Sequence, residues 1–347
     1  MPLQKQKSLN HINLCSDRNA RKLNIKNKMK EKNILEKIKE YRKNKKEIAL
    51  KKAEENKPQT FGEVVLSWVK SLGFALLFVM ILQSLLMGSF VVPTGSMENT
   101  VMTGDFLIVN KKFGPSTPQI IPFVEIPLPY ILFPTPFDPK RGDVIVFIYQ
   151  GGRDEIKPRD FTYYLKRCVA IPGDTLLIVD NQLYINGELQ DFPHEGLAAQ
   201  NIYRDNSSEV FRTFPVNKRF TNSNYGPIRI PKKGDTIHFN TSADFQNFRI
   251  FIEREGYQAN WLGDKALINN QTTNFYVVEQ NYYFGIGDNR DNSSDSREWG
   301  FIPRKAILGS PIFCWLSWEM YDEYGNERNI FGKFANIRWS RIGRGIN

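Results

Sequence analysis

The chain has 347 residues, enough for one large domain or two modest ones, and a formal net charge of +10. Its first 57 residues hold 18 Lys and Arg against 7 Asp and Glu, so the basic character belongs to a tail and predicts no nucleic-acid groove in the body. Three cysteines and three histidines share no motif, which excludes a disulfide framework and gives no basis for a metal site, a cofactor or a His-dependent triad.

Residues 1–63 are predicted to form a cytoplasmic tail. They are rich in Lys, and from about Met29 the apolar residues recur at a helical spacing. One interpretation is a polybasic segment attracted to anionic lipid head groups. The other is a solvated tail whose charge only fixes the topology, and the shortness of the apolar stripe favours it.

The next segment predicts a membrane span. Leu72–Val92 is an apolar run of 21 residues, which as a helix would be about 31 Å long and match a hydrocarbon core of about 30 Å. From Val64 to Val92 the only formal charge is Lys70. We therefore expect one transmembrane helix over residues 64–88. Because Lys and Arg crowd its N-terminal flank, the body should lie on the far side of the membrane from the tail.

Residues 89–347 predict a mostly β body. Short apolar runs at 105–112, 142–150, 162–171 and 174–188 alternate with turn residues and are rich in β-branched side chains. We expect antiparallel coiled sheets in a barrel-like domain. Two insertions interrupt this plan. Residues 114–139 are Pro-rich and predict either a membrane-touching loop or a cover over a cleft, and the polar residues 180–280 predict an inserted β subdomain.

Three places carry residues suited to chemistry. Ser96 follows Gly95 just beyond the apolar run, Lys166 lies between apolar residues of a predicted strand, and residues 285–300 form a loop dense in Gly, Asn, Asp and Ser. A serine nucleophile needs a base, and a desolvated lysine can supply one. Its pKa must then fall from about 10.4 by some 2–3 units through burial.

Together these segments resemble the type I signal peptidases, the bacterial leader peptidases. The resemblance covers residues 90–112, 140–175 and 284–318 in the family's order, and it includes the closing Arg-Trp-Ser-Arg-Ile-Gly. It implies a single-pass serine endopeptidase of the bacterial cytoplasmic membrane that needs no cofactor or metal and removes N-terminal signal peptides from exported preproteins. Its implied partners are signal peptides, the lipid bilayer and the export machinery, and not nucleic acid.

The resemblance also assigns roles to individual residues. Ser96 would be the nucleophile, Lys166 the general base, and the Ser96 N–H with the Thr94 hydroxyl the oxyanion hole. Ser293 would hydrogen-bond and orient the lysine. The loop would be supported by Asp288, Asn289 and the ion pair Asp295–Arg297. Shallow pockets that admit only small side chains would be lined by Phe90, Val92, Met97, Tyr164 and Leu165.

Some features leave alternatives open. Asn99 stands where the family usually has proline, which changes the turn after the serine. Cys168 is expected on the same strand face as Lys166, where it is either a reactive thiol or a buried small apolar residue. It either forms a disulfide with Cys314 or stays free. The competing functions are a specialised precursor-processing peptidase of the same family and a catalytically inactive, membrane-tethered β-domain that binds other proteins.

Overall fold

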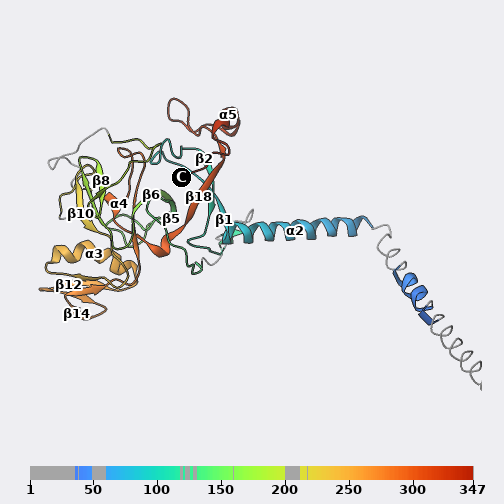
Figure 1. Ribbon diagram of the computed structural model, residues 1–347, viewed down its shortest axis with the longest axis horizontal. Helices are drawn as coiled ribbons and strands as arrows, with labels where there is room; N and C mark the ends of the chain where they lie inside the picture. The colour runs from blue at the N-terminus through green and yellow to red at the C-terminus, as the bar shows by residue number, and fades with distance from the viewer. Residues whose placement is uncertain are drawn as a thin grey trace, which may run out of the picture. The chain divides into compact units, whose positions relative to one another are not determined.

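Figure 1 shows the computed structural model of the chain. The structure describes residues 60–117, 131–158, 160–199, 212–216 and 218–346, with short pieces at 36–37, 39–48, 120–121 and 126–127. The chain divides into two compact units, residues 1–74 and 75–347. In the predicted tail, the described residues 36–37 and 39–48 are helical and exposed, and the rest of residues 1–59 lies outside the described residues.

The apolar run forms helix α2, Phe61–Leu85. A reciprocal pair of hydrogen bonds begins it: Thr60 N–H donates to Glu63 Oε2 at 2.8 Å, and Glu63 N–H donates to Thr60 Oγ1 at 3.4 Å. Among the described residues it is the one helix long and apolar enough to cross a membrane. The predicted helix is therefore confirmed, and its crossing of a membrane remains a prediction.

The predicted C-terminal end of this helix is wrong. Met87–Val91 is not helical but forms strand β1, which pairs antiparallel with β2, Asp105–Asn110. Gly88 and the β-branched Val91 and Val92 favour an extended chain over a helix. Helix and strand are thus separated only by Leu86.

The core of the body is a seven-stranded antiparallel sheet, in the order β1-β2-β18-β5-β6-β16-β17. Irregular registers in β18 and β16 interrupt the ladder, and such bulges bend a sheet. The fold-class prediction, mostly antiparallel β with one N-terminal apolar helix, is confirmed. The remaining strands are β18 (Ile307–Ser317), β5 (Val144–Ile148), β6 (Tyr163–Ala170), β16 (Tyr282–Ile286) and β17 (Ile302–Pro303).

Side chains alternate across the sheet and fill two apolar clusters. In β5, Val144 and Val146 pack on one side while Ile145 and Phe147 pack on the other. Both faces of this part of the sheet are therefore buried, and the neighbouring strand β6 carries its side chains into the same interior. Cys168 belongs to one of these clusters, and both it and Cys314 are buried free thiols. The alternatives of a disulfide and of a reactive thiol at Cys168 are therefore wrong.

The predicted insertion 180–280 begins within a second sheet, of order β10-β7-β8-β9. Its strands are β7 (Thr175–Val179), β8 (Gln182–Ile185), β9 (Glu188–Leu189) and β10 (Tyr225–Arg229). Two smaller sheets follow, one of β11 (Thr236–His238) with β15 (Phe275–Val277), the other of β12 (Ala259–Leu262), β13 (Lys265–Ile268) and β14 (Gln271–Thr273). The proposed division into domains stays a prediction.

The sequence analysis missed a helix here. Helix α3, Ser242–Arg254, packs against β12 and β13. Thr241 caps its N-terminus by accepting a hydrogen bond from the Asp244 N–H, and Phe245, Phe248 and Ile252 recur at helical spacing on its apolar side. That cap and that spacing are the signal that predicts it.

The Pro-rich segment 114–139 is only partly described. It contains the short paired strands β3 (Ile120–Ile121) and β4 (Ile126–Pro127), and residues 118–119, 122–125 and 128–130 lie outside the described residues. Both interpretations of this segment stay predictions. The described body also contains the short α-helices α4 (Ser296–Trp299) and α5 (Ile330–Ala335) and the 3-10 helices η2 (Arg304–Ala306) and η3 (Trp339–Arg341).

Candidate active site

The structure brings Ser96 and Lys166 together. Ser96 lies in the turn that follows β1, and Lys166 lies in β6, far away along the chain. Lys166 Nζ donates a hydrogen bond to Ser96 Oγ at 2.7 Å. The pair therefore has the distance that direct proton transfer between a nucleophile and its base requires.

Lys166 is buried with an exposed fraction of only 4%. It faces Ile145 across the β5–β6 ladder, and its Nζ lies 5.6 Å from the centre of the Tyr164 ring. Burial lowers the pKa of Lys166 to about 8, with Asp295 acting in the opposite direction. At pH 7 about a tenth of this amine is therefore unprotonated and able to accept a proton, far more than for a solvent-exposed lysine.

The loop after β16 holds the serine turn from behind. The backbone N–H of Asn289 donates to the Ser96 carbonyl at 3.1 Å, and its Nδ2 donates to the Gly95 carbonyl at 3.0 Å. Asp288 accepts two hydrogen bonds from Arg167, at 2.8 and 2.7 Å, and one from Thr100 Oγ1 at 2.7 Å. Asp288 thereby ties the segment after Ser96 to the strand that carries Lys166.

A buried ion pair stiffens the same loop. Arg297 Nε and Nη2 donate to the two carboxylate oxygens of Asp295 at 2.9 and 2.8 Å, and both side chains are almost fully buried. Burial alone would raise the pKa of Asp295, but the charge and hydrogen bonds of Arg297 hold it below its usual value. Asp295 also accepts from the Gly287 N–H at 3.1 Å, so the pair fixes the backbone that touches the serine turn.

Gly287 lies where this loop approaches the serine turn. A Cβ atom at this position would overlap Ser293 Oγ and would lie 2.5 Å from the Ser96 carbonyl oxygen. The Ser293 hydroxyl thus fills the space beside Gly287. It is buried and makes no hydrogen bond to Lys166, so the predicted lysine-orienting contact is not formed in this structure.

An apolar groove of about 800 Å³ opens over the pair. Phe90, with its ring centre 4.8 Å from that of Tyr163, lies along it, and Val92 and Met97 are buried beside Ser96. Thr94 lines the groove and is exposed. All five predicted pocket residues line it (Phe90, Val92, Met97, Tyr164, Leu165), together with Ser89, Phe161, Tyr163, Asn292 and Ser294, which the sequence analysis did not select.

The turn after the serine differs from one built on proline. Asn99 has a φ of 71°, in the left-handed region that asparagine tolerates. Proline fixes φ near −65° and cannot adopt this conformation. The replacement of proline by Asn99 therefore goes with a backbone conformation at position 99 that proline could not adopt.

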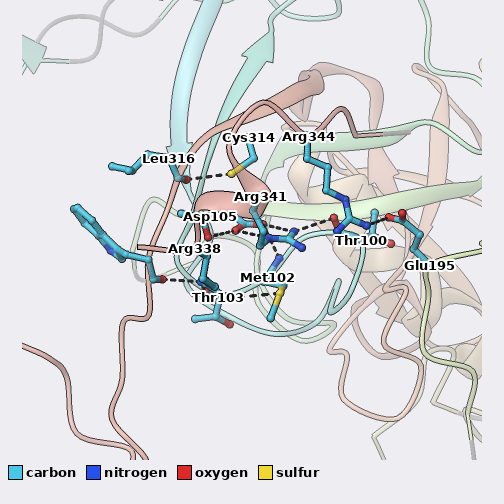
Figure 2. Close-up of polar contacts among 12 residues, drawn as sticks. Thr100, Met102, Thr103, Asp105, Glu195, Cys314, Leu316, Arg338, Arg341 and Arg344 are labelled. Atoms are coloured by element: carbon cyan, nitrogen blue, oxygen red, sulfur yellow. Dashed lines mark hydrogen bonds and ion pairs between the residues drawn. The ribbon is translucent and has the colours of Figure 1, made fainter. Parts of the chain in front are cut away.

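A second support for this turn comes from the chain's C-terminal segment, as Figure 2 shows. Arg341 donates to both carboxylate oxygens of the buried Asp105, at 2.9 and 2.6 Å, and more weakly to the Thr100 carbonyl at 3.4 Å. Arg338 donates to the Thr103 carbonyl. These arginines belong to the closing motif of the sequence, and together they hold residues 100–105.

Comparisons with known proteins show which family the chain resembles. Residues 65–318 match the family described as signal peptidase, peptidase S26. Signal peptidase I of Helicobacter pylori is 28% identical over 292 residues, covering 81% of this chain and 91% of the relative. That of Pseudomonas aeruginosa is 28% identical, covering 74% of each, and that of Aquifex aeolicus 27%, covering 78% of this chain and 94% of the relative.

A crystal structure of signal peptidase I from Enterococcus faecalis is 20% identical, with a TM-score of 0.23, covering 50% of this chain and 97% of that one. No group of three or more His, Cys, Asp or Glu side chains within the described part of the chain is placed to hold a metal ion. The family match spans well over half of the sequence and includes both Ser96 and Lys166. The chain belongs to the signal peptidase family, peptidase S26.

Proposed function

We propose that this protein is a membrane-anchored serine endopeptidase that cleaves N-terminal signal peptides from exported preproteins. The relatives are named signal peptidase I, which supports this class of substrate. The observation that carries the mechanism is the 2.7 Å contact between Ser96 Oγ and the buried amine of Lys166.

In the proposed reaction the neutral Lys166 amine accepts the Ser96 hydroxyl proton as Ser96 Oγ attacks the scissile carbonyl. The C–N bond of the tetrahedral intermediate then breaks, and Lys166 returns the proton to the departing amine of the mature protein. Lys166 next deprotonates a water that attacks the acyl-enzyme, and Ser96 regains its proton as the signal peptide leaves. The Ser96 N–H and the Thr94 hydroxyl would stabilise the oxyanion in both steps.

The groove supports selection by size. Its walls are largely apolar, and buried Val92 and Met97 lie beside the nucleophile. A methyl side chain next to the scissile bond fits such a shallow site, and a larger one clashes. We infer cleavage after small residues, with the substrate extended between Phe90–Pro93 and Thr162–Leu165, where it would add as a strand.

We infer that α2 crosses the bacterial cytoplasmic membrane once, with the basic residues 1–63 in the cytoplasm. The length and hydropathy of Phe61–Leu85 and the excess of Lys and Arg before it support this topology. It would place the groove just outside the bilayer, where a signal peptide held in the membrane presents its cleavage site.

The direct test uses the full chain, purified in detergent, with one preprotein and with Ser96→Ala as the matched control. Wild type should release a mature protein whose new N-terminus, identified by mass spectrometry, follows a small residue. Ser96→Ala should release none while remaining folded. An equal yield from both proteins would rule out the proposal, and absence of cleavage by wild type would favour the inactive binding module.

The pH dependence of cleavage should follow Lys166. The base works only when neutral, and burial lowers its pKa to about 8. The rate should therefore rise with pH through an apparent pKa near 8 and level off above it. Initial rates across a pH series measure this, with unfolding monitored at each pH. A rate that falls as pH rises through this range would contradict a lysine base.

A further inference from the structure

Lys111, directly after β2, is a buried cation outside the active site. Its exposed fraction is 8%, and burial lowers its pKa. No carboxylate among the described residues forms an ion pair with it. Its Nζ instead donates to the Ser84 carbonyl at 3.3 Å. Because burying a lysine without an anion is unfavourable, a carbonyl at a helix end is a significant compensating partner.

Three hydrogen bonds from the body meet this end of α2. Besides the Lys111 ammonium, the Ser116 N–H donates to the Ser84 carbonyl at 3.2 Å, and the Lys111 N–H donates to the Leu86 carbonyl at 2.9 Å. The last carbonyls of a helix have no partner within the helix. Here Lys111 and Ser116, in the segment after β2, donate the hydrogen bonds that these carbonyls accept.

No flexible linker separates this helix end from the groove. Leu86 alone lies between α2 and β1, and the groove lining begins in β1 at Ser89. Gly88 adds a direct contact, because a Cβ there would lie 2.6 Å from the Phe90 ring and 3.2 Å from Lys111 Cε. Because Gly88 has no side chain, the Lys111 stem and the ring of Phe90, a groove residue, can both lie against its backbone.

We propose that Lys111 is a positioning residue that fixes the last turn of α2 against β1 and β2, so that the groove is held at a set height and rotation relative to the membrane. This rests on the proposed function, since it takes α2 as the membrane span. The residue does not touch the substrate. Its contribution should therefore concern only substrates that are themselves held in the bilayer.

The test compares two substrates in proteoliposomes: a preprotein inserted through its signal peptide, and a short water-soluble peptide with the same cleavage sequence. Lys111→Met keeps the apolar stem and removes the donor. It should lower kcat/KM for the inserted preprotein by about tenfold, through misplacement of the scissile bond, and leave the peptide within about twofold of wild type. Lys112→Met, the same change at the exposed neighbour, is the matched control and should alter neither.

Each outcome has a defined meaning. Equal losses on both substrates would show that Lys111 serves the folding of the body and would overturn the proposal, as would wild-type rates on both. If wild type cleaves both substrates and Lys111→Met behaves like Lys112→Met, only this inference fails. If wild type cleaves neither substrate, the proposed function fails with it.

Discussion

Replacing Lys166 with methionine should lower kcat for preprotein cleavage by at least about 10³-fold. Methionine preserves the apolar stem in its place between β5 and β16, so the fold should be retained. It removes the amine that lies 2.7 Å from Ser96 Oγ, and the described groove offers no other base at that distance. Single-turnover cleavage, with thermal unfolding as the check on folding, measures the effect.

Two further variants sharpen this prediction. Lys166→Arg should be equally inactive, because guanidinium does not release its proton near neutral pH. The double variant Ser96→Ala/Lys166→Met should be no slower than either single variant, since the two groups act as one unit. Substantial activity in Lys166→Arg, or losses that multiply in the double variant, would contradict the proposed pairing.

Replacing Gly287 with alanine should lower kcat by about 10²-fold. The added Cβ would overlap Ser293 Oγ and come within 2.5 Å of the Ser96 carbonyl oxygen. The neighbouring backbone cannot retreat easily, because Gly287 N–H is bound to the buried Asp295 and Asn289 N–H to Ser96. The serine turn must therefore shift, and the Ser96 hydroxyl moves away from Lys166.

Gly152→Ala is the matched control for this change. Its Cβ would meet only ordinary contacts of 3.7 Å or more, in the loop between β5 and β6. It should cleave at the wild-type rate. A folded Gly287→Ala protein that cleaves as fast as wild type would contradict the prediction. The close approach of the loop to Ser96 would then not determine the geometry of the site.

Local patterns carried the fold predictions that held. The short apolar, β-branched runs of β2, β5 and β6 and the long apolar run of helix α2 are each recognisable within a few residues. The end of α2 was not predictable in this way, because hydrophobicity continues through Met87–Val91 while the structure there is decided by pairing with β2. Tertiary pairing overrode a local apolar signal.

The site shows the same division. Ser96, Lys166 and the Asp295–Arg297 pair could be selected from sequence because each lies in a distinctive short motif. The positions of Asn289 against Gly95 and of Arg341 against Asp105 depend on contacts between segments far apart in the chain. Ser293 was assigned by resemblance, and its hydroxyl instead occupies the space beside Gly287.

The arginines of the closing motif have a consequence for biosynthesis. Residues 100–105, which follow the serine turn, are held by Arg338 and Arg341, which come much later in the chain. A growing polypeptide exposes Ser96 long before those arginines have emerged from the ribosome. Until Arg341 has emerged, Asp105 lacks its cation, and this support of the serine turn is missing. We therefore expect a nascent chain that displays Ser96 but not yet residues 338–341 to lack full activity.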